Sequence, residues 1–62
     1  MDKVIEERVT VICELGCVRV REVIMALQLG ADVPEIAAHT AEQRGAILRE
    51  LQAIMAVYDT RD

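Results

Sequence analysis

The sequence contains neither tryptophan nor phenylalanine, and Tyr58 is its only aromatic residue. A set of aromatic side chains, on which proteins stack the bases of single-stranded nucleic acid, is therefore missing. Large side chains that fill the centre of a compact globule are missing as well. The residues counted as hydrophobic make up 53% of the chain and are almost all aliphatic. Aliphatic residues at this density favour helices that pack on other helices across an interface.

Positive charge is also scarce. Seven Lys and Arg residues stand against eleven Asp and Glu residues, which gives a formal net charge of −4. Nucleic acids and anionic membranes are bound largely through basic surfaces, so this balance argues against both partners. No stretch reaches the ~20 apolar residues of a membrane span. The start of the chain is rich in charged residues and lacks the continuous apolar stretch of a secretory signal. We therefore expect a soluble, cytoplasmic protein.

The chain has two cysteines, Cys13 and Cys17, which are too close together to staple a loop of useful length. On a helix, residues four apart lie on one face, so the pair can form half of a metal site with His39 as a third ligand. Three ligands fall short of a closed zinc site unless two chains share it. We favour the interpretation that both cysteines are small buried hydrophobic residues. A shared metal and a thiol-based redox role are the alternatives.

Signatures of catalysis are absent from the sequence. There is no Gly-rich phosphate loop, no G-x-S-x-G and no H-E-x-x-H. The single histidine, His39, has no Ser, Cys or carboxylate at a spacing that predicts a catalytic pair. The sequence therefore predicts a protein that is not an enzyme and that binds no cofactor.

Apolar residues recur at helical spacing before a region of turn-forming residues at positions 30–34. This stripe predicts one helix over about residues 3–29, closed by Gly30 and able to bend at Gly16. Segments 9–13 and 17–21 are also rich in β-branched residues, so a β-hairpin over residues 9–21 is the competing interpretation. The residues of the stripe are Ile5, Val9, Ile12, Gly16, Val20, Val23 and Leu27.

Two capping boxes follow the turn region. Asp32-x-x-Glu35, with Pro34 in its first turn, predicts a short helix over about residues 33–38. Thr40-x-x-Gln43 predicts a longer helix over about residues 41–58, because an amphipathic apolar pattern follows it. The predicted fold is all-α, with residues 1–62 as one domain. It is a two-helix hairpin made of a long helix, a short connector helix and a second long helix.

Sixty-two residues make a marginal domain. Such a chain buries about 60% of the surface that its unfolded form exposes. Apolar burial at about 25 cal/mol/Å² is then roughly offset by an ordering cost of about 1.5 kcal/mol per residue. We therefore expect the hairpin to form a homodimer with a four-helix core. The predicted interface residues are Val9, Ile12, Val20, Ile24, Leu27, Ile47, Leu51, Ile54 and Met55.

These features favour a non-enzymatic protein–protein interaction module: a small subunit, adaptor or assembly factor that acts as a homo-oligomer, with a larger protein as a further partner. The alternative is a dimeric helix-turn-helix regulator, because the turn at Gly30 has the spacing of that motif. Its recognition helix, residues 33–39, offers Glu35 but no Arg, Lys, Asn or Gln to contact base edges. A thiol or metal sensor that uses Cys13 and Cys17 is the third hypothesis.

Overall fold

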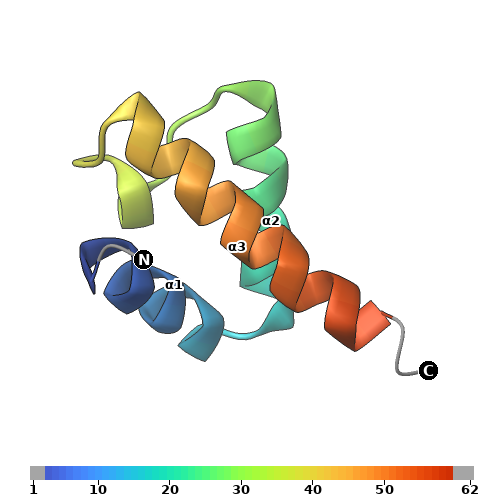
Figure 1. The fold of residues 1–62 in the computed structure, drawn as a ribbon. Coiled ribbons are helices and arrows are strands. Elements are labelled where there is room, and N and C mark those ends of the chain that lie inside the picture. Colours follow the sequence, from blue (N-terminus) through green and yellow to red (C-terminus); the bar gives the residue numbers. More distant parts are fainter. Residues whose placement is uncertain (1–2, 60–62) are drawn as a thin grey trace.

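The structure is a computed structural model that describes residues 3–59. Over that range the chain forms three α-helices and one 3-10 turn: α1 (Lys3–Glu14), α2 (Cys17–Leu29), η1 (Pro34–Ile36) and α3 (Ala41–Asp59) (Figure 1). The predicted all-α class is confirmed for this part of the chain. The competing β-hairpin over residues 9–21 is not formed, because both of its segments are helical.

The predicted single helix over residues 3–29 is divided at Gly16. This residue has φ 103° and ψ 160°, a conformation that only glycine adopts readily. The N–H of Leu15 donates to the carbonyl of Ile12 at 3.0 Å, and the N–H of Gly16 donates to that of Cys13 at 3.2 Å, which ends α1. The chain therefore turns a corner at Gly16, and three helices replace the predicted two-helix hairpin.

The end of α2 lies where the sequence predicts it. Gly30 is in the left-handed conformation with φ 76°. Its N–H donates to the carbonyl of Leu27 at 3.2 Å, and the N–H of Ala31 donates to that of Ala26 at 2.8 Å. This pair of bonds is a Schellman motif, which satisfies carbonyl groups that the helix end leaves without partners.

The two predicted capping boxes have different outcomes. At the start of α3, the N–H of Gln43 donates to Thr40 Oγ1 at 3.1 Å and the N–H of Thr40 donates to Gln43 Oε1 at 3.0 Å, so this box is confirmed. The prediction of a capping box at Asp32 and Glu35 is wrong, because Val33 is the N-cap residue of the 3-10 turn and no side chain donates or accepts a capping hydrogen bond there. The helix predicted over residues 33–38 is correspondingly reduced to Pro34–Ile36.

Both carboxylates of the failed box are instead bound by arginines from neighbouring helices. Arg19 of α2 donates to Glu35 through two bonds, Nε to Oε2 at 2.5 Å and Nη2 to Oε1 at 2.7 Å. Arg44 of α3 forms an ion pair with Asp32 and donates from Nε to the carbonyl oxygen of His39 at 3.2 Å. These contacts fasten the connector, residues 31–40, to α2 and α3.

Lowering the pH is expected to weaken the bond between Arg19 and Glu35. The Arg19 guanidinium, hydrogen-bonded to the Glu35 carboxylate, holds the pKa of Glu35 below its usual range. Such a group stabilises the fold above its unfolded pKa, about 4.3 for Glu, and that stabilisation is lost as the pH falls through the folded pKa. We therefore expect Glu35→Gln to lower the free energy of unfolding at neutral pH, with a difference that shrinks below about pH 4.

Urea denaturation of both proteins at neutral and acidic pH measures this difference. Glu7→Gln, which changes an exposed carboxylate on α1, is the matched control. A Glu35→Gln deficit of the same size at both pH values would contradict the predicted contribution of the ion pair.

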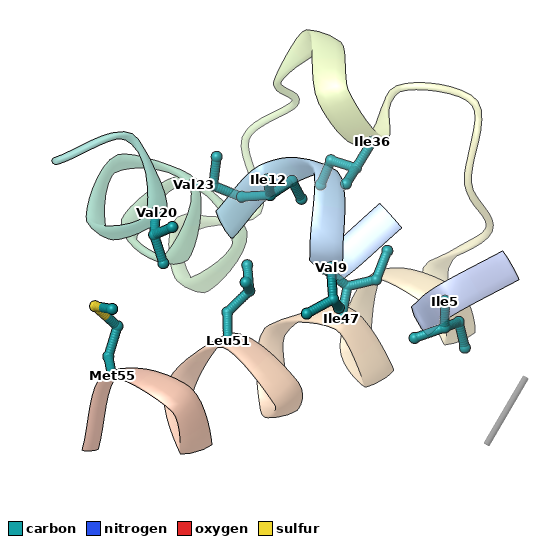
Figure 2. Packing of buried hydrophobic residues seen from close by; sticks show 9 residues of the cluster. All are labelled: Ile5, Val9, Ile12, Val20, Val23, Ile36, Ile47, Leu51 and Met55. Carbon is teal, nitrogen blue, oxygen red and sulfur yellow. The ribbon is translucent and has the colours of Figure 1, made fainter. Parts of the chain in front are cut away.

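The hydrophobic core lies where α1 and α2 both pack against α3 (Figure 2). Because the chain turns at Gly16, the apolar stripes of α1 and α2 converge on one face of α3, and η1 adds one side chain from the connector. Burial is thereby achieved within a single chain. The buried residues are Ile5, Val9, Ile12, Val20, Val23, Ile36, Ile47, Leu51 and Met55.

Candidate interaction surface

Most of the residues predicted to form a dimer interface lie inside the chain's own core. Six of the nine are buried against other helices of the same chain: Val9, Ile12, Val20, Ile47, Leu51 and Met55. Ile24, Leu27 and Ile54 are partly buried at the edge of this core. The reason is the corner at Gly16, which lets α1 cover the stripes that a straight helix leaves open. Of these six side chains, Met55 also lines a surface hollow between α2 and α3, and the other five face the chain's own core.

An apolar groove of about 430 Å³ lies between α2 and α3. Its lining comes from these two helices alone, so it opens on a side of the α2–α3 contact that α1 does not cover. Ile24 and Met55 line the groove and also pack with the core, which makes the bottom of the groove continuous with the core. The lining residues are Arg21, Ile24, Met25, Gln28, Gln52, Met55 and Ala56.

A second hollow of about 290 Å³ lies between the end of α2 and the start of α3. Along α3, the residues that line the two hollows are three or four positions apart, which places them on one side of the helix. We call the residues that line one or the other of these hollows, taken together, the α2–α3 face. The second hollow contributes Leu27, Gly30, Ala31, Ala41, Arg44, Gly45 and Leu48.

The α2–α3 face carries little charge. Two of its fourteen residues, Arg21 and Arg44, are charged, whereas charged residues make up 29% of the whole chain. Arg44 is already paired with Asp32. Met25, which lines the groove, and Leu29, one turn further along α2, are 62% and 78% exposed. Depletion of charge and exposure of methionine are typical of the centre of a protein–protein interface.

The outer surface of α1 differs from the α2–α3 face. It also exposes apolar side chains, including Val4 and Val11. However, five of the twelve residues of α1 are charged, so these apolar positions are interspersed with solvated groups. Isolated exposed aliphatic residues of this kind are ordinary on protein surfaces. The charged residues of α1 are Lys3, Glu6, Glu7, Arg8 and Glu14.

The two cysteines differ in how deeply they are buried. Cys13, near the end of α1, is half-buried. Burial raises the pKa of its thiol, and the neighbouring Cys17 raises it further. Cys17 is the first residue of α2 and is exposed, so the prediction that both thiols are buried is wrong for Cys17. His39 lies in the connector. Over residues 3–59, no cluster of three or more His, Cys, Asp or Glu side chains is arranged to hold a metal ion.

The two thiols are expected to react at different rates with a thiol reagent in the folded state. Cys17 is accessible, whereas Cys13 is partly covered and has a raised pKa, so less reactive thiolate is present at neutral pH. We predict one fast and one slow thiol, measured by absorbance with an aromatic disulfide reagent. Cys17→Ser, used as the assigning variant, is expected to remove the fast phase. Equal rates for both thiols would contradict the assignment.

The recognition helix that the helix-turn-helix hypothesis requires is not formed in this structure. Of residues 33–39, only Pro34–Ile36 are helical, in a single 3-10 turn. The one charged side chain of that segment, Glu35, is bound to Arg19. A recognition helix must present several side chains to base edges along the major groove, and a three-residue turn is too short to do so.

Comparison with models of known protein families, with curated proteins and with solved structures gives no match to this chain. In the described part of the chain, no helix has the length and apolar character needed to cross a membrane.

Proposed function

We propose that this chain is a non-enzymatic protein–protein interaction module, a small subunit, adaptor or assembly factor, and that the α2–α3 face is its binding surface. The observation that carries this proposal is the apolar groove whose bottom is formed by Ile24 and Met55. Covering such a groove removes apolar surface from water, which is the main driving force of protein association. Contiguous exposed apolar surface bordered by polar residues commonly marks an interaction site.

The shape of the face indicates the kind of partner. Two helices that meet at an angle leave a furrow between them, and the side-chain ridge of another helix fits such a furrow. Gln28 and Gln52 line the groove beside its apolar residues and offer amide groups to polar atoms of a partner. We therefore expect the partner to present an apolar helical surface.

The charged side chains brought together by the fold have a structural role, which supports the non-enzymatic part of the proposal. Arg19 binds Glu35 and Glu22, and Arg44 binds Asp32. The contacts of Arg19 with Glu35 and of Arg44 with Asp32 hold the connector against the helices. Catalysis instead requires titratable groups aimed at a site where a substrate can sit.

Chromatography of the protein at its native expression level tests the proposal. In an extract of its own cells, the parent chain is expected to elute well above the 6.9 kDa of one chain. Met25→Glu places a charge in the lining of the apolar groove and is expected to return the chain to the elution volume of a monomer, because an unpaired charge is costly to bury.

Val11→Glu is the matched control, since it places the same charge at an exposed valine of α1. It is expected to elute with the parent. A parent chain that elutes as a free monomer would refute the interaction module, and loss of assembly in both variants would refute the choice of face.

A further inference from the structure

We infer that Gly16 selects between two forms of this chain, the closed form of this structure and an open form that exchanges α1 with a second copy. In the open form α1 continues α2 as one straight helix, and the α1 segment of each copy packs on the core of the other. The inference does not use the α2–α3 face, so its failure would leave the proposed function unchanged. Its support comes from the phase of the apolar stripe across the corner, the way the corner is held, and the contacts of α1.

The buried positions of α1 and α2 are in phase with each other across the corner. They are Ile5, Val9 and Ile12 on α1 and Val20 and Val23 on α2. At about 100° per residue, these positions in one continuous helix all fall within about 80° of its circumference. The closed form does not require this agreement, because a corner lets each helix turn its own face to α3. A straight helix does require it, so the sequence contains a pattern that only the open form uses.

The corner is short and is held by its backbone. Two residues, Leu15 and Gly16, lie between the last residue of α1 and the first residue of α2. Gly16 has a positive φ, and no side chain caps the start of α2. The first N–H groups of a helix have no partner within it, whereas in a straight helix the N–H of Cys17 would donate to the carbonyl of Cys13. Opening the corner therefore breaks no capping bond to a side chain and adds helical bonds between backbone groups.

The contacts of α1 select a second copy as the partner of the open form. Although α1 is joined to α2 by the corner, it also packs against α3, which comes much later in the chain. Ile12 lies in one buried cluster with Ile47 and Leu51. The α1 of another copy has the same side chains on the same helix, so it can repeat the contacts with α3. Exchange of an identical element is a low-cost route to a dimer, and short hinges favour it.

Glycine at position 16 keeps the chain closed at ordinary concentrations. Closure within one chain competes with a second copy at an effective concentration of about 1 mM. Alanine disfavours the positive φ of the corner and favours a helix, which together shift the closed-to-open equilibrium by about thirtyfold per chain. A dimer contains two chains, so its dissociation constant is expected to fall about a thousandfold, from about 1 mM to about 1 µM. Below that concentration the variant has no second copy to cover its core.

Sedimentation of the purified proteins at about 200 µM tests this inference, because that concentration lies between the two dissociation constants. The parent and Gly45→Ala are expected to have the 6.9 kDa mass of one chain, and Gly16→Ala is expected to have twice that mass. A chain synthesised with D-alanine at position 16 is the matched control. It has the composition of Gly16→Ala, but it favours positive φ and disfavours a right-handed helix, so it is expected to be a monomer. A monomeric or unfolded Gly16→Ala chain, or a D-alanine chain that dimerises, would overturn the inference.

Cross-linking distinguishes the exchange of α1 from any other dimer. Ile5 of α1 and Ala46 of α3 line the same small hollow, so a short bis-maleimide can join cysteines placed at both positions. The native thiols are removed by Cys13→Ser and Cys17→Ser. With glycine at position 16 the link is expected to stay within one chain, and with Gly16→Ala it is expected to join two chains in denaturing electrophoresis. A Gly16→Ala dimer that is linked only within its chains would overturn the exchange.

Discussion

Replacing Leu51 by alanine is expected to remove most of the stability of this domain. Leu51 is fully buried at the middle of α3, where it contacts the core formed with α1 and α2 (Figure 2). Truncating a buried leucine costs about 2–5 kcal/mol, because transfer free energy is lost and a cavity remains. That cost is comparable to the total stability of a domain this small. The variant is therefore expected to be largely unfolded near physiological temperature.

Urea denaturation followed by circular dichroism measures the loss. Arg49→Ala is the matched control, because Arg49 is exposed on the same helix and two positions away. Substitutions at exposed positions of this kind change stability by about 0.5 kcal/mol or less. If Leu51→Ala and Arg49→Ala unfolded at the same urea concentration, α3 would not pack against the core as the structure shows.

The apolar periodicity identified the core residues but not how they pack together. Ile12, Val20 and Leu51 were each predicted to lie in an apolar interface, and each is buried. An apolar stripe along a helix indicates that its side chains are buried. It does not indicate whether the surface that covers them belongs to the same chain. Here the cover is supplied by the same chain after it turns at Gly16. Most of the residues predicted to face a second copy are therefore core residues of this chain.

The helix ends show a similar division between local and non-local information. Gly30 and Thr40 act through bonds within a few residues, and both were predicted correctly. The capping box of Asp32 and Glu35 failed because arginines distant in sequence bind both carboxylates. Local patterns contain no information about such partners, which are set by the packing of α2 and α3 against the connector.

The candidate surface could be predicted from the sequence only in part. Ile24, Leu27 and Met55 of the α2–α3 face were among the predicted interface residues. Met25 and Leu29 were not, because they lie beside the main stripe of α2. A signal for them existed: Val18, Met25 and Leu29 are seven and four positions apart, which forms a second apolar line on α2. Helices with two such lines have two faces to cover, and the core covers only one of them.

Gly16→Ala is expected to destabilise the fold through the backbone alone. At φ 103° and ψ 160°, Gly16 occupies a region that is essentially restricted to glycine, and forcing another residue into it costs about 1–3 kcal/mol. An added Cβ would meet no atom within 4 Å, so the cost does not come from a steric clash with neighbouring residues. The same substitution favours a helical conformation at position 16 by about 1 kcal/mol. Both effects oppose the corner and favour the straight helix that the apolar stripe permits.

Gly45→Ala provides the opposite control in the same chain. Gly45 lies inside α3, its φ is not positive, and an added Cβ would meet no atom within 4 Å. Alanine there is expected to stabilise the monomer by about 0.5–1 kcal/mol, because glycine loses more conformational freedom on folding. Urea denaturation of the purified proteins compares the two variants. A straight helix through position 16 would pull Ile5, Val9 and Ile12 away from α3. The Gly16→Ala variant is therefore expected to lose the protection of its core amides from hydrogen exchange while it retains its helical circular dichroism. If Gly16→Ala and Gly45→Ala stabilised the protein equally, the corner at position 16 would not require glycine.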